Sequence, residues 1–197
     1  MTRLPKLIEV TMTDVGKIID QLSHADALSI LRTLADEDEQ LGRRIAKIAQ
    51  NLLSDVDRED VADYLYAELD ALEVDDVWEQ AGPSRHGYAE PSEVAYQMVE
   101  DVLEPFLHEL RRYQELGMSV ESTQLCAGLL MGLYRFERAS TSEFKDWAPD
   151  APISFAAEVV EAWKKGRPSD TAVATLTKFI REELSGWGQH LLQGKDF

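Results

Sequence analysis

Four histidines and a single cysteine are the side chains of this sequence best suited to bind a metal or act as a nucleophile. The histidines, His24, His86, His108 and His190, do not form the HExxH or Glu-x-x-His spacings of zinc proteases and di-iron proteins. Cys126 cannot form an internal disulfide, and its apolar surroundings in the sequence predict a buried, unreactive thiol. We therefore predict no catalytic residue, no metal site and no cofactor.

Two further patterns could carry chemistry, and each has a simpler explanation. Asp101, Glu104 and His108 share one face at helical spacing, but a solvated face of an acidic helix accounts for them without a metal. Residues 82–87 have the outer glycine spacing of a P-loop, yet they lack its Lys-Ser/Thr and no strand precedes them. The sequence thus favours a protein without enzymatic activity.

Two long loops, at residues 82–90 and 139–151, contain the best candidates for a binding site. Loops often carry binding residues, and these two combine aromatic, cationic and acidic side chains. The candidate ligand- or partner-binding residues are Arg85, His86, Tyr88, Lys145, Asp146 and Trp147. The competing interpretation is that Trp147 closes the end of the core and Asp146 caps a helix. An open pocket would favour the first interpretation, and a filled surface the second.

The elements that must position these loops are all helical. Apolar residues recur at helical spacing, whereas alternating β patterns are absent. The predicted helices span about 14–22, 24–35, 38–53, 58–73, 91–116, 120–138, 152–165 and 168–192. Ser23 and Asp26 form a capping box before the second of these helices. If successive helices run up and down, both long loops lie at the same end of the fold.

Three features of the longest helices support specific predictions. Pro105 should not end the helix at 91–116, because its apolar spacing continues from Val94 to Leu110. The helix at 120–138 has almost no polar side, so we expect it to be the most buried. Gly128 and Gly132 share one of its faces and would allow another helix to approach closely.

Composition limits the domain count and the partners. The chain has 197 residues, 44% of them hydrophobic, which fits a single domain over 1–197 with a flexible or docked N-terminal arm at about 1–13. Any weak division is expected near Gly82. A formal net charge of -17 disfavours nucleic acid and anionic membranes, and it suits a basic protein partner. No secretory signal or membrane-spanning run is visible, which predicts a cytoplasmic location.

Residues 27–52 resemble a HEAT repeat, with a Leu-rich first helix, an acidic turn and a second helix that has an early basic residue and small residues inside. Two short segments, Gly87–Pro91 and Ser142–Trp147, also resemble uncharacterised prokaryotic helical proteins. The HEAT resemblance implies antiparallel hairpins stacked into a short α-α superhelix; the alternative is a closed helical bundle.

By analogy, the resemblance implies a non-enzymatic scaffold or adaptor that binds another protein. The alternative function is a small-ligand binder or hydrolase with its site on loops 82–90 and 139–151. A third hypothesis is regulation of a neighbouring protein through homo-oligomer assembly, although the sequence does not determine the oligomeric state.

Overall fold

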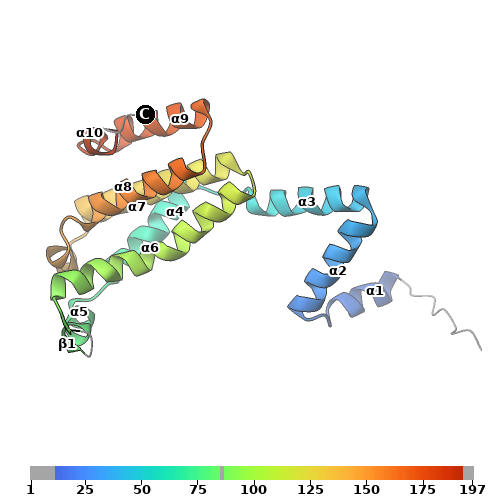
Figure 1. The fold of residues 1–197 in the computed structure, drawn as a ribbon, viewed down its shortest axis with the longest axis horizontal. Coiled ribbons are helices and arrows are strands. Elements are labelled where there is room, and N and C mark those ends of the chain that lie inside the picture. The colour runs from blue at the N-terminus through green and yellow to red at the C-terminus, as the bar shows by residue number, and fades with distance from the viewer. Residues whose placement is uncertain (1–11, 85–86, 193–197) are drawn as a thin grey trace, which may run out of the picture. The chain divides into compact units, whose positions relative to one another are not determined.

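A computed structural model of the chain describes residues 12–84 and 87–192 (Figure 1). Its contacts divide the chain into two compact units, Met1–Leu53 and Ser54–Phe197. The division therefore lies after Leu53 and not near Gly82, because the elements on both sides of Gly82 belong to the second unit. The expected N-terminal arm lies outside the described residues except for its last two, which begin α1. The expectation of a single domain over 1–197 stays a prediction.

The described residues form an all-α fold, as the sequence predicts. The α-helices are α1 (Met12–Ile19), α2 (His24–Glu37), α3 (Glu39–Leu53), α4 (Arg58–Asp70), α5 (Val74–Gln80), α6 (Pro91–Glu115), α7 (Ser119–Ala139), α8 (Ala151–Lys165), α9 (Asp170–Glu183) and α10 (Gly188–Leu191). A 3-10 helix, η1 (Glu143–Trp147), lies between α7 and α8. Over this part of the chain, no helix has both the length and the apolar character that crossing a membrane requires.

Two local predictions are wrong. Strands β1 (Gly82–Ser84) and β2 (Gly87–Ala89) form a small antiparallel hairpin where only a loop was expected. The predicted helix at 168–192 is interrupted between α9 and α10, where Gly186 adopts a φ of +97°. That conformation is accessible to glycine and strained for other residues, so the chain turns there instead of continuing as helix.

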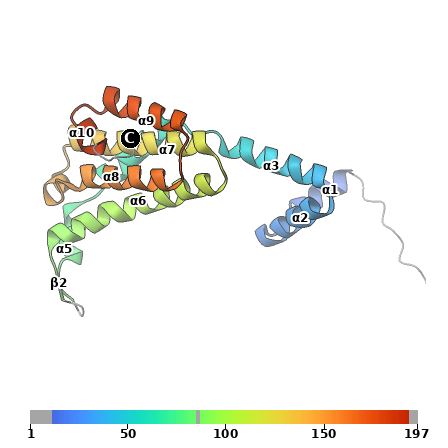
Figure 2. The same ribbon diagram turned by 45° about the horizontal axis from the view of Figure 1, so that its top comes forward.

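Helix α7 is the centre of the second unit. It packs against α4, α6, α8 and α9, and it has more buried residues than any other described helix, as predicted (Figures 1 and 2). Gly128 and Gly132 face α4: a Cβ atom at Gly128 would lie 2.7 Å from Val61 Cβ. Glycine at these two positions therefore allows α4 to lie directly against α7.

Helix α6 continues through Pro105 from Pro91 to Glu115, which confirms the prediction that the proline does not end it. It packs on α7 and α8. Short connections join α6 to α7 and α8 to α9 at one end of this unit, while the β hairpin and η1 lie at the other (Figures 1 and 2). The two long loops thus share one end, as the up-and-down arrangement predicted.

The first unit is built differently. Ser23 caps α2 by accepting the Asp26 N–H at 3.2 Å, and Asp38 caps α3 by accepting the N–H groups of Gln40 and Leu41. The two helices contact one another and diverge from their common turn at Asp38 (Figures 1 and 2). Neither α2 nor α3 contains a buried residue. Within the first unit, their apolar faces are therefore uncovered.

A candidate binding groove between α4 and α6

The candidate residues of the two loops are only partly brought together. Arg85 and His86 lie outside the described residues. Tyr88 lies in β2 with 61% of its surface exposed. The Trp147 ring of η1 meets the Trp78 ring of α5 edge-on, with centroids 4.9 Å apart. This contact places η1 against the helix that leads into the hairpin, but within the described residues no hydrogen bond, ion pair or ring contact joins Tyr88 to η1.

The Lys145 side chain forms hydrogen bonds that have a structural role. Its Nζ atom donates hydrogen bonds to the carbonyls of Glu137 and Ser140, both at 2.8 Å. These carbonyls lie at the C-terminal end of α7, where helical carbonyls lack partners of their own and attract a cation. Phe144 is buried and Asp146 is exposed. The lysine therefore caps α7, and the role of the six loop residues in binding stays a prediction.

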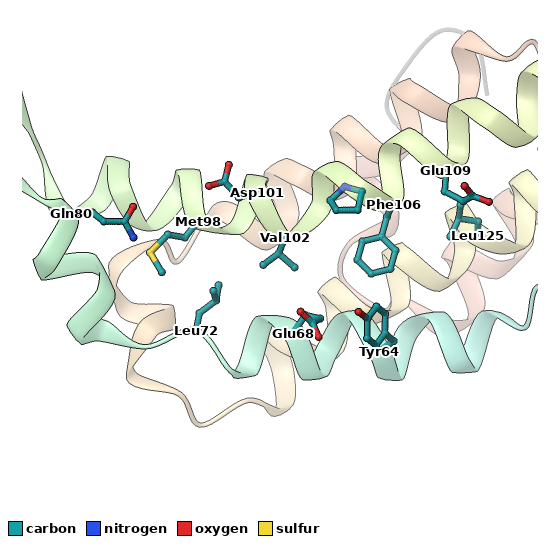
Figure 3. Close-up of a pocket in the computed structure, with 11 residues that line it drawn as sticks. Tyr64, Glu68, Leu72, Gln80, Met98, Asp101, Val102, Phe106, Glu109 and Leu125 are labelled. Atoms are coloured by element: carbon teal, nitrogen blue, oxygen red, sulfur yellow. The ribbon is translucent and has the colours of Figure 1, made fainter. Parts of the chain in front are cut away.

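A groove of about 530 Å³ lies on the second unit between α4 and α6 (Figure 3). Both helices pack on α7, but they touch one another far less, so a space remains between them. Gln80 of α5 lies at one end, and Leu125 of α7 contributes to the lining. The apolar lining residues are Leu72, Met98, Val102, Pro105, Phe106 and Leu125. We call this space the α4–α6 groove.

The α6 wall of the groove follows one face of that helix. Its lining residues fall at positions 98, 101, 102, 105, 106 and 109, spacings of three and four residues. At 1.5 Å per residue they extend over about 16 Å, or three helical turns. Because Pro105 has no N–H, the Asp101 carbonyl lacks its helical donor, and both residues line the groove. This wall therefore combines apolar side chains with the acidic side chains of Asp101 and Glu109.

Aromatic rings close the groove at the end away from Gln80. Tyr64 projects from α4 towards Phe106 of α6, and the ring centroids are 5.7 Å apart at an interplanar angle of 56° (Figure 3). Tyr64 remains 59% exposed. Met98, by contrast, is only 9% exposed. The groove is therefore bounded near Gln80 by the buried Met98 and at the other end by an aromatic pair in which Tyr64 is partly exposed.

All charged residues that line the groove are acidic: Glu68, Asp101 and Glu109. Asp101 accepts a hydrogen bond from Gln97 at 2.9 Å, and Glu109 pairs with Arg112 at 3.0 Å. The surrounding sequence strengthens this charge, because residues 58–115 contain 16 Asp and Glu against 4 Lys and Arg. Charge of one sign beside an apolar surface attracts ligands of the opposite sign. The groove is thus apolar at its base and negative at its rim.

Two groups near the centre of this unit have shifted pKa values. Burial raises the pKa of Tyr113 above its usual 10.0, and the negative charge of Glu109 raises it further. Burial also strongly raises the pKa of the Cys126 thiol, since no charged partner offsets the loss of water around the thiolate. Neither group is therefore ready to act as a nucleophile or base at neutral pH. In the described ranges, no cluster of three or more His, Cys, Asp or Glu could hold a metal ion.

Sequence analysis did not identify the α4–α6 groove. The signal that it contained was the apolar spacing of residues 91–116, which continues from Val94 to Leu110. Val102 and Phe106 follow that spacing, are not fully buried in the structure, and line the groove. A pattern within one helix does not show how far away its neighbour lies, so the space between α4 and α6 could not be derived from it.

Comparisons of the chain with protein-family models, with curated proteins and with solved structures found no match.

Proposed function

We propose that this protein is a non-enzymatic binding module whose α4–α6 groove holds a basic amphipathic helix of a partner protein. One observation carries the proposal: an apolar groove whose only charged lining residues are acids. Helix-in-groove recognition uses apolar anchors at helical spacing, and oppositely charged residues at the rim set orientation and association rate.

The dimensions of the groove suit a helix. From Met98 to the Tyr64–Phe106 ring pair its α6 wall is about 12 Å long, which matches anchors placed at i, i+4 and i+7 on a partner helix. Lys or Arg residues beside those anchors would face Glu68 and Asp101 on opposite walls, since these two acids come from α4 and α6 (Figure 3). Such a ligand would cover apolar surface and neutralise part of the local negative charge.

A small-ligand site is supported by the groove volume alone. About 530 Å³ lies within the range of roughly 300–1,000 Å³ that small-molecule sites occupy. Specific small-molecule sites usually add a few converging polar donors, and the groove offers mainly carboxylates. An anionic metabolite is disfavoured for the same reason. The hydrolase or ligand site on loops 82–90 and 139–151 remains the alternative.

A designed helical peptide would test the proposal directly. The probe carries Leu at i, i+4 and i+7 with Lys on its flanks, and a scrambled peptide of equal composition is the control. Fluorescence anisotropy should show binding of the probe but not of the scrambled peptide, and added salt should weaken that binding. Val102→Glu in the groove should weaken binding about tenfold or more, whereas Val120→Glu on exposed α7 surface should leave it unchanged.

A charge reversal that does not alter the apolar core makes the test independent of folding defects. Glu68→Lys should weaken binding of the basic probe, while Glu158→Lys on the exposed face of α8 should have little effect. Equal effects of the two reversals would show that only the overall charge matters. In an NMR titration with the probe, chemical shift changes at Tyr88 and Trp147 instead of at groove residues would favour the loop site.

A further inference from the structure

Taken by itself, the first unit presents an apolar surface that its own described helices leave uncovered. We define the α2–α3 apolar face as Leu28, Leu31 and Leu34 of α2 with Ile48 and Leu52 of α3. Each is exposed, from 37% for Leu34 to 78% for Leu52. Isolated exposed leucines are ordinary, but exposed apolar residues that recur at helical spacing on two successive helices mark a surface that binds something.

The residues of this face recur at helical spacing, so on each helix they form one apolar face instead of isolated exposed positions. Leu28, Leu31 and Leu34 recur every three residues of α2, and Ile48 and Leu52 are four apart on α3. Neither helix buries a single side chain. Helices in water gain most of their stability from burial of such a stripe, so these two require an apolar partner.

Net charge differs sharply between the two units. Residues 1–53 carry 7 Lys and Arg against 8 Asp and Glu, a formal net charge of -1. Residues 54–197 carry 13 against 29, a net charge of -16. Two copies that met through the second unit would bring like charge together, whereas two that met through the first would not. The nearly neutral unit is therefore the one that can self-associate.

Charges of both signs are grouped on the first unit in a self-complementary way. Asp36 and Glu37 end α2, and Arg44 and Lys47 lie on α3; among the described residues none of these four forms an ion pair. In a two-fold interface each copy presents the same surface, so the acids of one copy are available to the bases of the other. A second copy thus offers both an apolar stripe and the missing counter-charges.

We infer that the α2–α3 apolar face joins two copies of this chain into a symmetric dimer. The inference is independent of the groove, which lies on the second unit. Other occupants would be the second unit of the same chain, which would leave the chain monomeric, a different protein, or an anionic lipid surface, which the basic residues of α3 could approach. The high negative charge of the whole chain opposes the lipid surface, and the self-complementary charges favour a second copy.

Mass measurement on the full chain tests the inference. Sedimentation or light scattering at micromolar concentration should report twice the 22.2 kDa chain mass. Ile48→Asp should raise the dimer dissociation constant about tenfold or more. Leu116→Asp, at a position in the second unit that is 49% exposed against 51% for Ile48, should leave the mass unchanged. A monomeric wild-type chain, or a dimer that Ile48→Asp does not weaken, would overturn the inference.

A charge-swap pair keeps the test informative even if Ile48→Asp unfolds α3. In one full chain Arg44→Glu and Lys47→Glu make the charge clusters wholly acidic, and in the other Asp36→Lys and Glu37→Lys make them wholly basic. Each variant alone should be monomeric, and an equal mixture should form heterodimers. Failure of the mixture to dimerise, or wild-type monomers that bind vesicles of anionic phospholipid, would overturn the inference.

Discussion

The ring of Tyr64 on α4 packs against that of Phe106 on α6, with centroids 5.7 Å apart. This pair spans the α4–α6 groove at its aromatic end, where the helices otherwise have few contacts. It therefore has two consequences: it contributes to the folding stability of the second unit, and it shapes the surface that we propose as a binding site.

Tyr64→Ala should lower the free energy of unfolding by about 0.5–1.5 kcal/mol, because it removes the interaction between the two rings. Tyr88→Ala is a matched control, since the two tyrosines are 59% and 61% exposed and Tyr88 has no ring partner among the described residues. Urea unfolding of both variants measures the difference. Equal losses would show that the ring pair contributes nothing.

Gly128→Ala should destabilise the protein by about 1–3 kcal/mol through overpacking. A Cβ atom there would lie 2.7 Å from Val61 Cβ and 2.8 Å from the Arg58 carbonyl oxygen, so α4 would have to move. Gly188→Ala is the control, because no atom lies within 4 Å of its added Cβ. Thermal unfolding should show a lowered Tm for the first variant only. An unchanged Tm for Gly128→Ala would mean that α4 does not lie directly against α7.

Cys126 should react with a thiol reagent only after unfolding. The side chain is fully buried in α7, and burial raises its pKa, which suppresses the reactive thiolate. Reaction with Ellman's reagent in buffer, compared with reaction in guanidinium, measures the protection. Rapid labelling of the native protein at pH 8 would contradict the buried position of α7.

Tyr113 should make stability depend on pH in the alkaline range. Its pKa is higher in the folded protein than its usual 10.0, so folding favours the protonated phenol. The resulting stabilisation is complete below pH 10 and is lost as the pH rises through the folded-state pKa. Urea unfolding at pH 8, 10 and 11 should show a steeper loss for the wild type than for Tyr113→Phe. Parallel losses in the two proteins would rule out a contribution from this tyrosine.

Local patterns predicted the helices well where caps and periodicity agree. Ser23 caps α2 by accepting a backbone N–H group, as the predicted capping box indicated, and Asp57 caps α4 in the same way. Helix α6 runs through Pro105 because its apolar stripe outweighs one missing hydrogen bond. The break after α9 escaped prediction because apolar spacing continues across it, while Gly186 permits the turn.

The candidate site was harder to predict because it depends on the distance between elements. Lys145 has the chemistry of a binding residue, but the ends of α7 and η1 supply it with carbonyl partners that the sequence does not reveal. Val102 and Phe106 have the chemistry of core residues, but α4 lies far enough away to leave them lining a groove. Residue type and spacing in the sequence distinguished candidate binding side chains from candidate core side chains. Only tertiary packing determined which of them remained accessible.

The role of Lys145 distinguishes a structural loop from a binding loop. If the lysine caps α7, Lys145→Met should cost about 1–2 kcal/mol, because the carbonyls of Glu137 and Ser140 lose a charged donor. Lys178→Met, on the exposed face of α9, removes the same charge without this cap and should cost little. Urea unfolding measures both, and anisotropy with the helical probe measures binding by the same proteins. If Lys145 caps α7, Lys145→Met lowers the stability of the protein and leaves its affinity for the probe close to that of Lys178→Met. Unchanged stability of Lys145→Met would instead show that Lys145 does not cap α7, because a side chain held by two backbone acceptors cannot be removed without loss of those bonds.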